Sequence, residues 1–131
     1  MADDDPEDRA IIKDAMEEIN AGDVIGYTEN GEQAIEMLNQ LFHTSSKPSL
    51  IVLDLNMPKM NGMQTLEILK KDERYKDIPV IIYSTSINSL DKEKSLSLGA
   101  HSYITKPVSF TDCMATAKTF LDLCTARRTA G

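Results

Sequence analysis

Hydrophobic and polar positions along this chain fall into blocks that predict strands and helices in turn. Residues 50–53 and 78–83 are almost entirely aliphatic, which predicts strands buried on both faces. Residues 24–28 and 100–105 predict two shorter strands, of which the first is weakened by Gly26. The strands therefore number at least four, and each is separated from the next by a longer segment.

In those longer segments the apolar residues recur at helical spacing. The predicted helices cover residues 6–20, 34–42, a segment that follows Gly62, and residues 89–98 and 110–124. The last helix is the most regular, and the helix at 89–98 has the poorest periodicity. Strands that alternate with helices predict an α/β fold with a parallel sheet and right-handed crossovers.

Length and composition predict one soluble domain. The chain has 131 residues, of which 41% are hydrophobic and 27% charged, as in ordinary globular proteins. We expect the domain to cover residues 1–125, followed by a polar tail at 126–131. Cys113 and Cys124 lie on one predicted helix about 16 Å apart at 1.5 Å per residue, too far to bridge. A reducing, cytoplasmic setting is the expectation, with no membrane association.

The net charge of −7 is unevenly distributed. Residues 1–36 contain twelve acidic residues but only Arg9 and Lys13 as bases. Because no basic stripe is present, direct nucleic-acid binding is not expected. The acidic cluster is either a solvated helix face or part of a cation site.

Chemically versatile side chains occur where the predicted strands end. Asp54 directly follows the strand at 50–53, Ser84 follows the next strand, and Lys106 follows the last. Asp3 and Asp4 precede the first helix. Because ligand sites in open α/β sheets form at the carboxyl ends of the strands, these five residues are expected to converge.

Carboxylates together with one hydroxyl and one ammonium suit a hard cation and a phosphoryl group. Mg²⁺ prefers oxygen ligands and commonly takes one or two carboxylates plus phosphate oxygens. Asp54 is a candidate nucleophile for a phosphoryl group, and Lys106 and Ser84 are candidates to hold its oxygens. The alternatives are that Asp54 only caps its strand and that Ser84 belongs to a polar loop.

The order of these motifs resembles the receiver domain of bacterial two-component response regulators, over nearly the whole chain. The resemblance is carried by Asp3 and Asp4 ahead of a helix, the run at 53–62, Ser84 at a strand end, and the run at 103–107. It implies a flavodoxin-like doubly wound parallel sheet with strand order 2-1-3-4-5.

The resemblance also implies roles for individual residues. Asp54 is the implied phosphoacceptor, with Asp3, Asp4 and Asp54 as Mg²⁺ ligands together with the backbone carbonyl of Asn56. Ser84 occupies the position of the family's Ser/Thr switch. Lys106 occupies the position of the lysine that is characteristic of the family.

Two further positions bear on the switch. Tyr103 stands at the position of the family's rotating aromatic residue, although a half-buried strand aromatic is an equally ordinary role. Thr85 replaces the small residue that the family often has after the switch hydroxyl, which leaves the phosphorylation and dephosphorylation rates open.

Three functions follow as hypotheses. The first is a stand-alone receiver, not an enzyme beyond self-catalysed phosphorylation and dephosphorylation, whose partners are a sensor histidine kinase or histidine phosphotransfer protein and a downstream protein. The second is an Asp-nucleophile phosphatase or phosphomutase, disfavoured because Asn56 stands where the second Asp is needed. The third is a degenerate receiver that binds a partner without phosphorylation.

One departure from the family stands out at the N-terminus. Receivers begin with a hydrophobic strand of about five residues, whereas here only Met1 and Ala2 precede Asp3. Burial of four or five aliphatic side chains at ~1.5–3 kcal/mol each is comparable to the whole stability of a domain. The first strand is therefore expected to be missing, with a displaced acid pair, weak Mg²⁺ binding and dimerisation or aggregation at high concentration as consequences.

Overall fold

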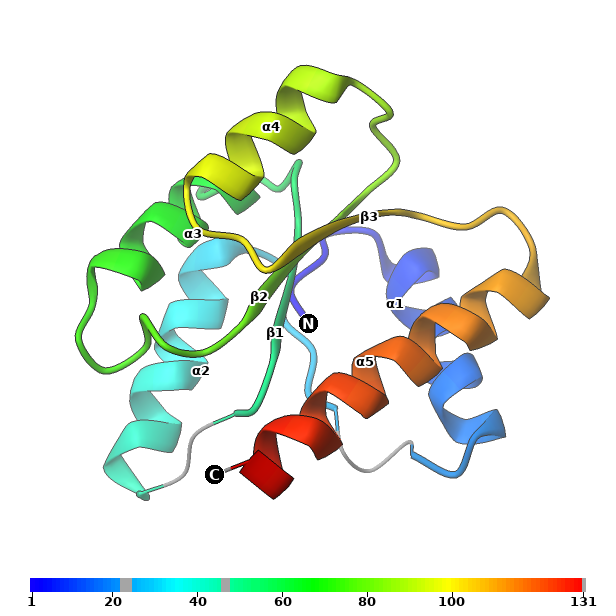
Figure 1. Ribbon diagram of the computed structural model, residues 1–131, viewed down its shortest axis with the longest axis horizontal. Coiled ribbons are helices and arrows are strands. Elements are labelled where there is room, and N and C mark those ends of the chain that lie inside the picture. The colour runs from blue at the N-terminus through cyan, green and yellow to red at the C-terminus, as the bar shows by residue number, and fades with distance from the viewer. Residues whose placement is uncertain (22–24, 46–47, 131) are drawn as a thin grey trace.

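The computed structural model describes residues 1–21, 25–45 and 48–130 (Figure 1). These residues form five helices and three strands, and from α2 onward helices and strands alternate, as the hydrophobic pattern predicts. They are α1 (Pro6–Glu18), α2 (Gly31–His43), β1 (Ile51–Asp54), α3 (Gly62–Lys71), β2 (Val80–Ser84), α4 (Ser89–Ser97), β3 (Ser102–Thr105) and α5 (Phe110–Ala130).

The three strands form a parallel sheet in the order β1-β2-β3. Ile51 pairs with Val80, and Ile81 pairs with Ser102. Helices α1 and α5 lie on one side of the sheet and α2 and α3 on the other (Figure 1). Both strands β1 and β2 are buried along their whole length, because helices cover both of their faces. The predicted flavodoxin-like fold is confirmed.

The N-terminal residues extend this sheet by one rung beyond β1. Ala2 forms parallel bridges with Leu53 on one side and Thr28 on the other. Its N–H donates to the carbonyl of Val52 at 2.8 Å, and its carbonyl accepts from the N–H of Asp54 at 2.8 Å. Across the sheet, the order is Thr28, Ala2, β1, β2 and β3. This matches the receiver order 2-1-3-4-5, with Thr28 in the place of the second strand and Ala2 in the place of the first, each reduced to an isolated bridge.

The prediction of a strand at residues 24–28 is wrong. Residues 25–27 are not in a strand, Thr28 makes only the bridge with Ala2, and Val24 lies outside the described residues. The physical reason is that a strand needs a ladder of hydrogen bonds along its edge, and here Met1 and Asp3 bond only to Gly26 and Thr28. The first strand, expected to be missing, survives as the single position Ala2.

Polar caps fix where the helices that border the site begin. The side chain of Asp5 accepts from the N–H of Glu7, and Pro6 occupies the first turn of α1. Asn61 and Gln64 form a capping box at the start of α3.

Helix α5 continues through Ala130 and so includes residues 126–130, for which the sequence predicts a polar tail. The boundary of the domain at residue 125 stays a prediction. Within the described residues, no helix combines the length and the apolar character needed to cross a membrane.

Candidate functional site

The strand ends bring the predicted residues to one edge of the sheet. Asp54 is the last residue of β1, Ser84 is the last of β2, and Lys106 directly follows β3. Asp3 follows the bridging residue Ala2, and its N–H donates to the carbonyl of Thr28 at 3.0 Å. Because all these segments run parallel, their carboxyl ends lie together. The acid pair therefore keeps its place despite the short N-terminus, contrary to the expected displacement.

Three carboxylates cluster at this edge. Asp3, Asp4 and Asp54 each contribute an oxygen, and these oxygens lie within 4.8 Å of one another. Asp3 and Asp54 are buried and Asp4 is exposed. The Oδ2 atom of Asp3 is buried and pairs with the ammonium of Lys106 at 2.9 Å. Three carboxylates close to one another carry a surplus of negative charge, which fits a hard divalent cation such as Mg²⁺ that takes oxygen ligands.

Lys106 lies among the carboxylates. Its Nζ atom is 2.9 Å from Asp3 Oδ2, 2.6 Å from Asp8 Oδ2 and 3.4 Å from Asp54 Oδ2. Burial disfavours the charged lysine, but the hydrogen bond to Asp8 and the proximity of Asp3 outweigh it and raise the pKa of Lys106. Lys106 is therefore a permanent cation, and it balances one of the negative charges around it.

Sequence reasoning assigned no role to Asp8, which makes the shortest of these contacts with Lys106. The signal in the sequence was the place of Asp8 in the first turn of α1, which begins shortly after Asp3 and Asp4. Arg9, the next residue, donates to the backbone carbonyl of Asp3 at 2.6 Å. The first turn of α1 thus holds both Asp3 and Lys106 in position.

The ionisation of Asp54 is strongly perturbed. Burial and the neighbouring charge of Asp3 raise the pKa of Asp54 to about 7, and Lys106 only partly opposes this. The N–H of Asn56 lies 3.4 Å from Asp54 Oδ1, a long hydrogen bond. Asn56 itself is exposed, which leaves its backbone carbonyl a predicted metal ligand.

The loop after β1 packs tightly against Asp54. Gly62, the first residue of α3, has its Cα so close to Asp54 that an added Cβ would lie 2.2 Å from the carbonyl oxygen of Asp54. Its N–H donates to the carbonyl of Leu55 at 3.0 Å. Lys59 adopts a left-handed backbone conformation with φ of 62° within the same loop. These contacts fix the path of the chain that leaves Asp54.

The two predicted switch residues are linked through Ser86. The Oγ atom of Ser84 accepts from the N–H of Ser86 at 3.1 Å. The hydroxyl of Tyr103 donates to the carbonyl of the same Ser86 at 2.8 Å. The N–H of Lys106 donates to the carbonyl of Ser84 at 2.7 Å, which ties the lysine to the same strand end. Ser84 is fully buried and Tyr103 is half-buried.

The family model that describes the response regulator receiver domain matches residues 1–118. The chain belongs to this family. Among curated relatives of this receiver, the chemotaxis protein CheY1 of Helicobacter pylori is 31% identical over 107 residues, which are 82% of this chain and 82% of that protein. The probable methanogenesis regulatory protein FilR2 of Methanothrix harundinacea is 32% identical over 82% of this chain and 70% of that protein.

Solved structures agree with the receiver fold. The phosphorylated cyanobacterial phytochrome response regulator RcpA superposes with a TM-score of 0.82 at 31% identity, over 94% of this chain and 89% of that one. The Mn²⁺-bound form of the response regulator Rcp1 gives a TM-score of 0.75 at 27% identity, over 91% of this chain and 87% of that one.

Other relatives are much longer than this receiver. A protein-glutamate methylesterase/protein-glutamine glutaminase of Methanococcoides burtonii is 38% identical over 101 residues, which are 76% of this chain but only 26% of that protein. The chain thus spans about a quarter of the length of this relative. The similarity supports a shared signalling domain and not the methylesterase activity.

Proposed function

We propose that this receiver accepts a phosphoryl group on Asp54 from a phosphohistidine of a sensor histidine kinase or histidine phosphotransfer protein. The observation that carries the proposal is the position of Lys106, which lies within 3.4 Å of Asp54 and also contacts Asp3 and Asp8 at the same sheet edge. Phosphoryl transfer depends mainly on positioning and on electrostatic stabilisation of the transferred oxygens, and this cluster offers both.

The proposed reaction is a displacement at phosphorus. A carboxylate oxygen of Asp54 attacks the phosphorus, and a phosphorus–oxygen bond forms as the phosphorus–nitrogen bond to histidine breaks. The electron pair of the broken bond goes to the imidazole nitrogen, which takes up a proton. The products are an aspartyl phosphate on this chain and a neutral histidine on the donor.

The side chains of this chain have distinct tasks in that reaction. Lys106 balances negative charge on the incoming phosphoryl oxygens, and Asp3 and Asp8 hold its ammonium in place. Ser84 lies at the adjacent strand end and supplies a hydroxyl to the same region. Mg²⁺ held by Asp3, Asp4 and Asp54, with the carbonyl of Asn56, would neutralise phosphoryl charge when bound.

The proposed output is a changed surface read by a downstream protein. A phosphoryl group adds roughly −1.5 to −2 charge units beside Lys106. Ser84 and Tyr103 both contact Ser86, so a shift of Ser84 toward the phosphoryl group would release or move Tyr103. We propose that the receiver signals through this surface, without enzymatic output of its own.

Phosphoryl transfer followed by intact-mass measurement tests the proposal. Acetyl phosphate with Mg²⁺ should add one phosphoryl group, Asp54→Asn should abolish the addition, and chelation of Mg²⁺ should prevent it. Asp77→Asn, which alters an exposed carboxylate in the same chain, is the control and should be labelled normally. A folded wild-type chain that takes up no phosphoryl group would favour the degenerate receiver instead.

A further inference from the structure

The ammonium of Lys106 is enclosed by side chains from four parts of the chain. The Lys106 side chain is only 8% exposed, and its Nζ atom lies 5.7 Å from the centre of the Tyr83 ring. The other neighbours are three carboxylate oxygens, Asp8 Oδ2 at 2.6 Å, Asp3 Oδ2 at 2.9 Å and Asp54 Oδ2 at 3.4 Å. Because little water reaches this ammonium, these neighbours must satisfy its charge and its N–H groups.

The three carboxylates differ in what else they can bind. Asp3 and Asp54 belong, with Asp4, to the group whose oxygens lie within 4.8 Å of one another and suit a divalent cation. Asp8 makes the shortest contact with Lys106 but is not a member of that group. A cation at the group therefore competes with Lys106 for two of its three carboxylate partners, and Asp8 is the partner that stays available.

The competition is strongest at Asp3, which is fully buried. Its Oδ1 atom accepts from the N–H of Asp5 at 3.0 Å, and its Oδ2 atom pairs with Lys106. When this carboxylate holds a divalent cation, the ammonium has a like charge beside it, and burial strengthens the repulsion. Lys106 must therefore move away from Asp3 for the cation to bind.

Other contacts limit where Lys106 can go. Its backbone N–H donates to the carbonyl of Ser84 at 2.7 Å, which fixes the base of the side chain at the end of β2. The Tyr83 ring borders the ammonium on a further side. Asp8 already accepts a hydrogen bond from Nζ at 2.6 Å, and its side chain is 27% exposed. A short shift toward Asp8 therefore keeps the ammonium paired with a negative charge.

We propose that Asp8 is a positioning residue that retains the Lys106 ammonium when a divalent cation occupies the carboxylates of Asp3, Asp4 and Asp54. Held in this way, the ammonium stays beside Asp54 and can still pair with the oxygens of an incoming phosphoryl group. This second part rests on the proposed function, whereas the effect of Asp8 on the cation does not. Asp8 acts through Lys106 and needs no contact with the cation.

Loss of the Asp8 carboxylate leaves Lys106 dependent on Asp3 and Asp54. A cation would then have to displace an ammonium that has lost its alternative charged partner, and an unpaired charge in a largely buried site is costly. Asp8→Asn should therefore weaken Mg²⁺ binding at least tenfold. The measurement is calorimetric titration of the full 131-residue chain with MgCl₂, in the absence of any phosphoryl donor. Wild-type affinity in a folded Asp8→Asn protein would overturn the proposal.

Glu7→Gln separates the contact with Lys106 from the general field of the acidic helix. Glu7 is exposed and directly precedes Asp8 in the first turn of α1, and the substitution removes the same unit of charge. It should weaken Mg²⁺ binding by no more than about twofold, because water and salt screen an exposed charge. Asp8→Glu keeps a carboxylate and should restore most of the affinity. Equal losses in Asp8→Asn and Glu7→Gln would contradict the proposed role of the contact.

A double-mutant comparison tests whether Asp8 acts through Lys106. In a Lys106→Met background the ammonium is absent, so adding Asp8→Asn should change Mg²⁺ affinity no more than adding Glu7→Gln does. A tenfold loss that persists in this background would mean that Asp8 acts on the cation directly, and the proposal would fail. Thermal melting checks that each variant is folded. If Lys106→Met does not fold, the comparison of Asp8→Asn with Asp8→Glu and Glu7→Gln still decides.

Phosphoryl uptake at saturating Mg²⁺ tests the second part of the proposal. Acetyl phosphate should label Asp8→Asn at least tenfold more slowly than the wild type even when the cation site is full, because the ammonium is no longer held beside Asp54. Equal labelling rates would overturn the role of Asp8 toward the phosphoryl group. A wild-type chain that takes up no phosphoryl group would contradict the proposed function instead, and the Mg²⁺ titrations would still decide whether Asp8 retains Lys106.

Discussion

The ionised form of the Asp54 side chain is unfavourable in the folded protein. The side chain is buried beside the charged Asp3, and Lys106, the cation beside it, is shared with Asp3 and Asp8. These surroundings raise the pKa of Asp54 to about 7. A nucleophile of this kind becomes available when a cation or a rise in pH favours its ionised form.

The raised pKa predicts a specific pH dependence of stability. Between pH 4 and pH 7 the folded state keeps a proton on Asp54 that the unfolded state has lost. The free energy of unfolding of the metal-free protein should therefore fall as the pH rises through this range, by an amount on the order of a few kcal/mol.

Chemical denaturation at a series of pH values, compared with Asp54→Asn, measures this effect. The variant lacks the titrating carboxyl and should show a shallower fall. Because Mg²⁺ favours the ionised carboxylate, millimolar Mg²⁺ should reduce the fall in the wild type. Parallel pH profiles of the two proteins would contradict the raised pKa.

At the scale of elements, the start of α3 controls the position of Asp54. Gly62→Ala would place a methyl group 2.2 Å from the carbonyl oxygen of Asp54, so the loop or the helix must move. Overpacking of this kind costs about 1–3 kcal/mol. We expect the variant to be destabilised by that amount and to take up phosphoryl groups slowly.

Gly26→Ala is the matched control for this substitution. Its added Cβ would meet no heavy atom closer than 3.7 Å, which is an ordinary contact. Thermal melting and phosphorylation of both variants give the comparison. If Gly62→Ala melts and reacts as the wild type does, the contact between α3 and the Asp54 loop has no role in positioning the carboxylate.

The segment from β2 to β3 is the expected moving element. Helix α4 buries only Ser95 among its nine residues, while Leu90 in its first turn and Ile87 in the preceding loop are largely exposed. Elements that move are generally drawn from regions with few buried contacts. Hydrogen exchange should therefore change most across residues 85–106 on phosphorylation, and Tyr103→Phe should reduce the difference by removing the bond to Ser86. A response confined to the Asp54 loop would contradict this mechanism.

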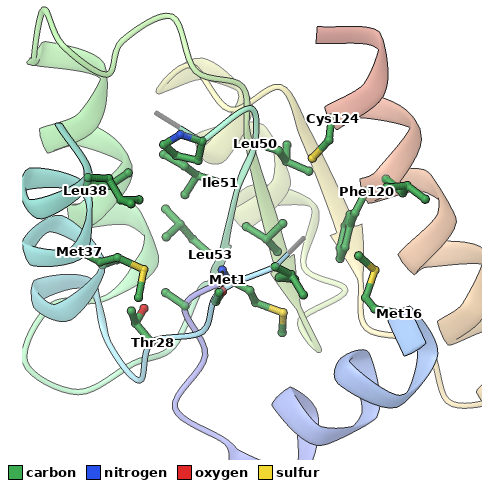
Figure 2. Close-up of a pocket in the computed structure, with 18 residues that line it drawn as sticks. Met1, Met16, Thr28, Met37, Leu38, Leu50, Ile51, Leu53, Phe120 and Cys124 are labelled. Atoms are coloured by element: carbon green, nitrogen blue, oxygen red, sulfur yellow. Dashed lines mark hydrogen bonds between the residues drawn. The ribbon is translucent and has the colours of Figure 1, made fainter. Parts of the chain in front are cut away.

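At the scale of the whole molecule, an apolar cavity of about 420 Å³ lies beside the N-terminal half of β1 (Figure 2). Five added residues, Lys-Ile-Leu-Leu-Val, joined ahead of Ala2 or Met1 should pair with the edge at 48–52 and bury aliphatic side chains in the 420 Å³ cavity. Burial at ~1.5–3 kcal/mol for each side chain should raise the melting temperature by roughly 10 °C or more and speed phosphorylation. Thermal melting of monomeric samples checks this, and equal melting temperatures would mean that the added residues do not fill the cavity.

The hydrophobic pattern alone determined most of the architecture. Continuous aliphatic runs at β1 and β2 and helical spacing in α2, α3 and α5 identified these elements, because periodic burial leaves a direct record in the sequence. The strand-end positions of Asp54, Ser84 and Lys106 followed from the parallel topology, which places carboxyl ends at one edge. The family resemblance then gave these residues their predicted roles.

Only the tertiary structure decided the remaining points. Two residues before Asp3 were too few to predict a strand, yet hydrogen bonds of Ala2 to β1, and of Met1 and Asp3 to Thr28, place the acid pair beside Asp54. The strand predicted at 24–28 is reduced to a bridge at Thr28 for a related reason. Strand propensity is local, but the hydrogen bonds of a strand must come from a neighbouring chain segment, and only Met1 and Asp3 bond to this one. Asp8 could not be recognised from the sequence as a partner of Lys106, because the two are 98 residues apart and only the folded chain brings their charged atoms to 2.6 Å. Patterns determine elements; contacts between distant elements depend on the geometry of the assembled fold.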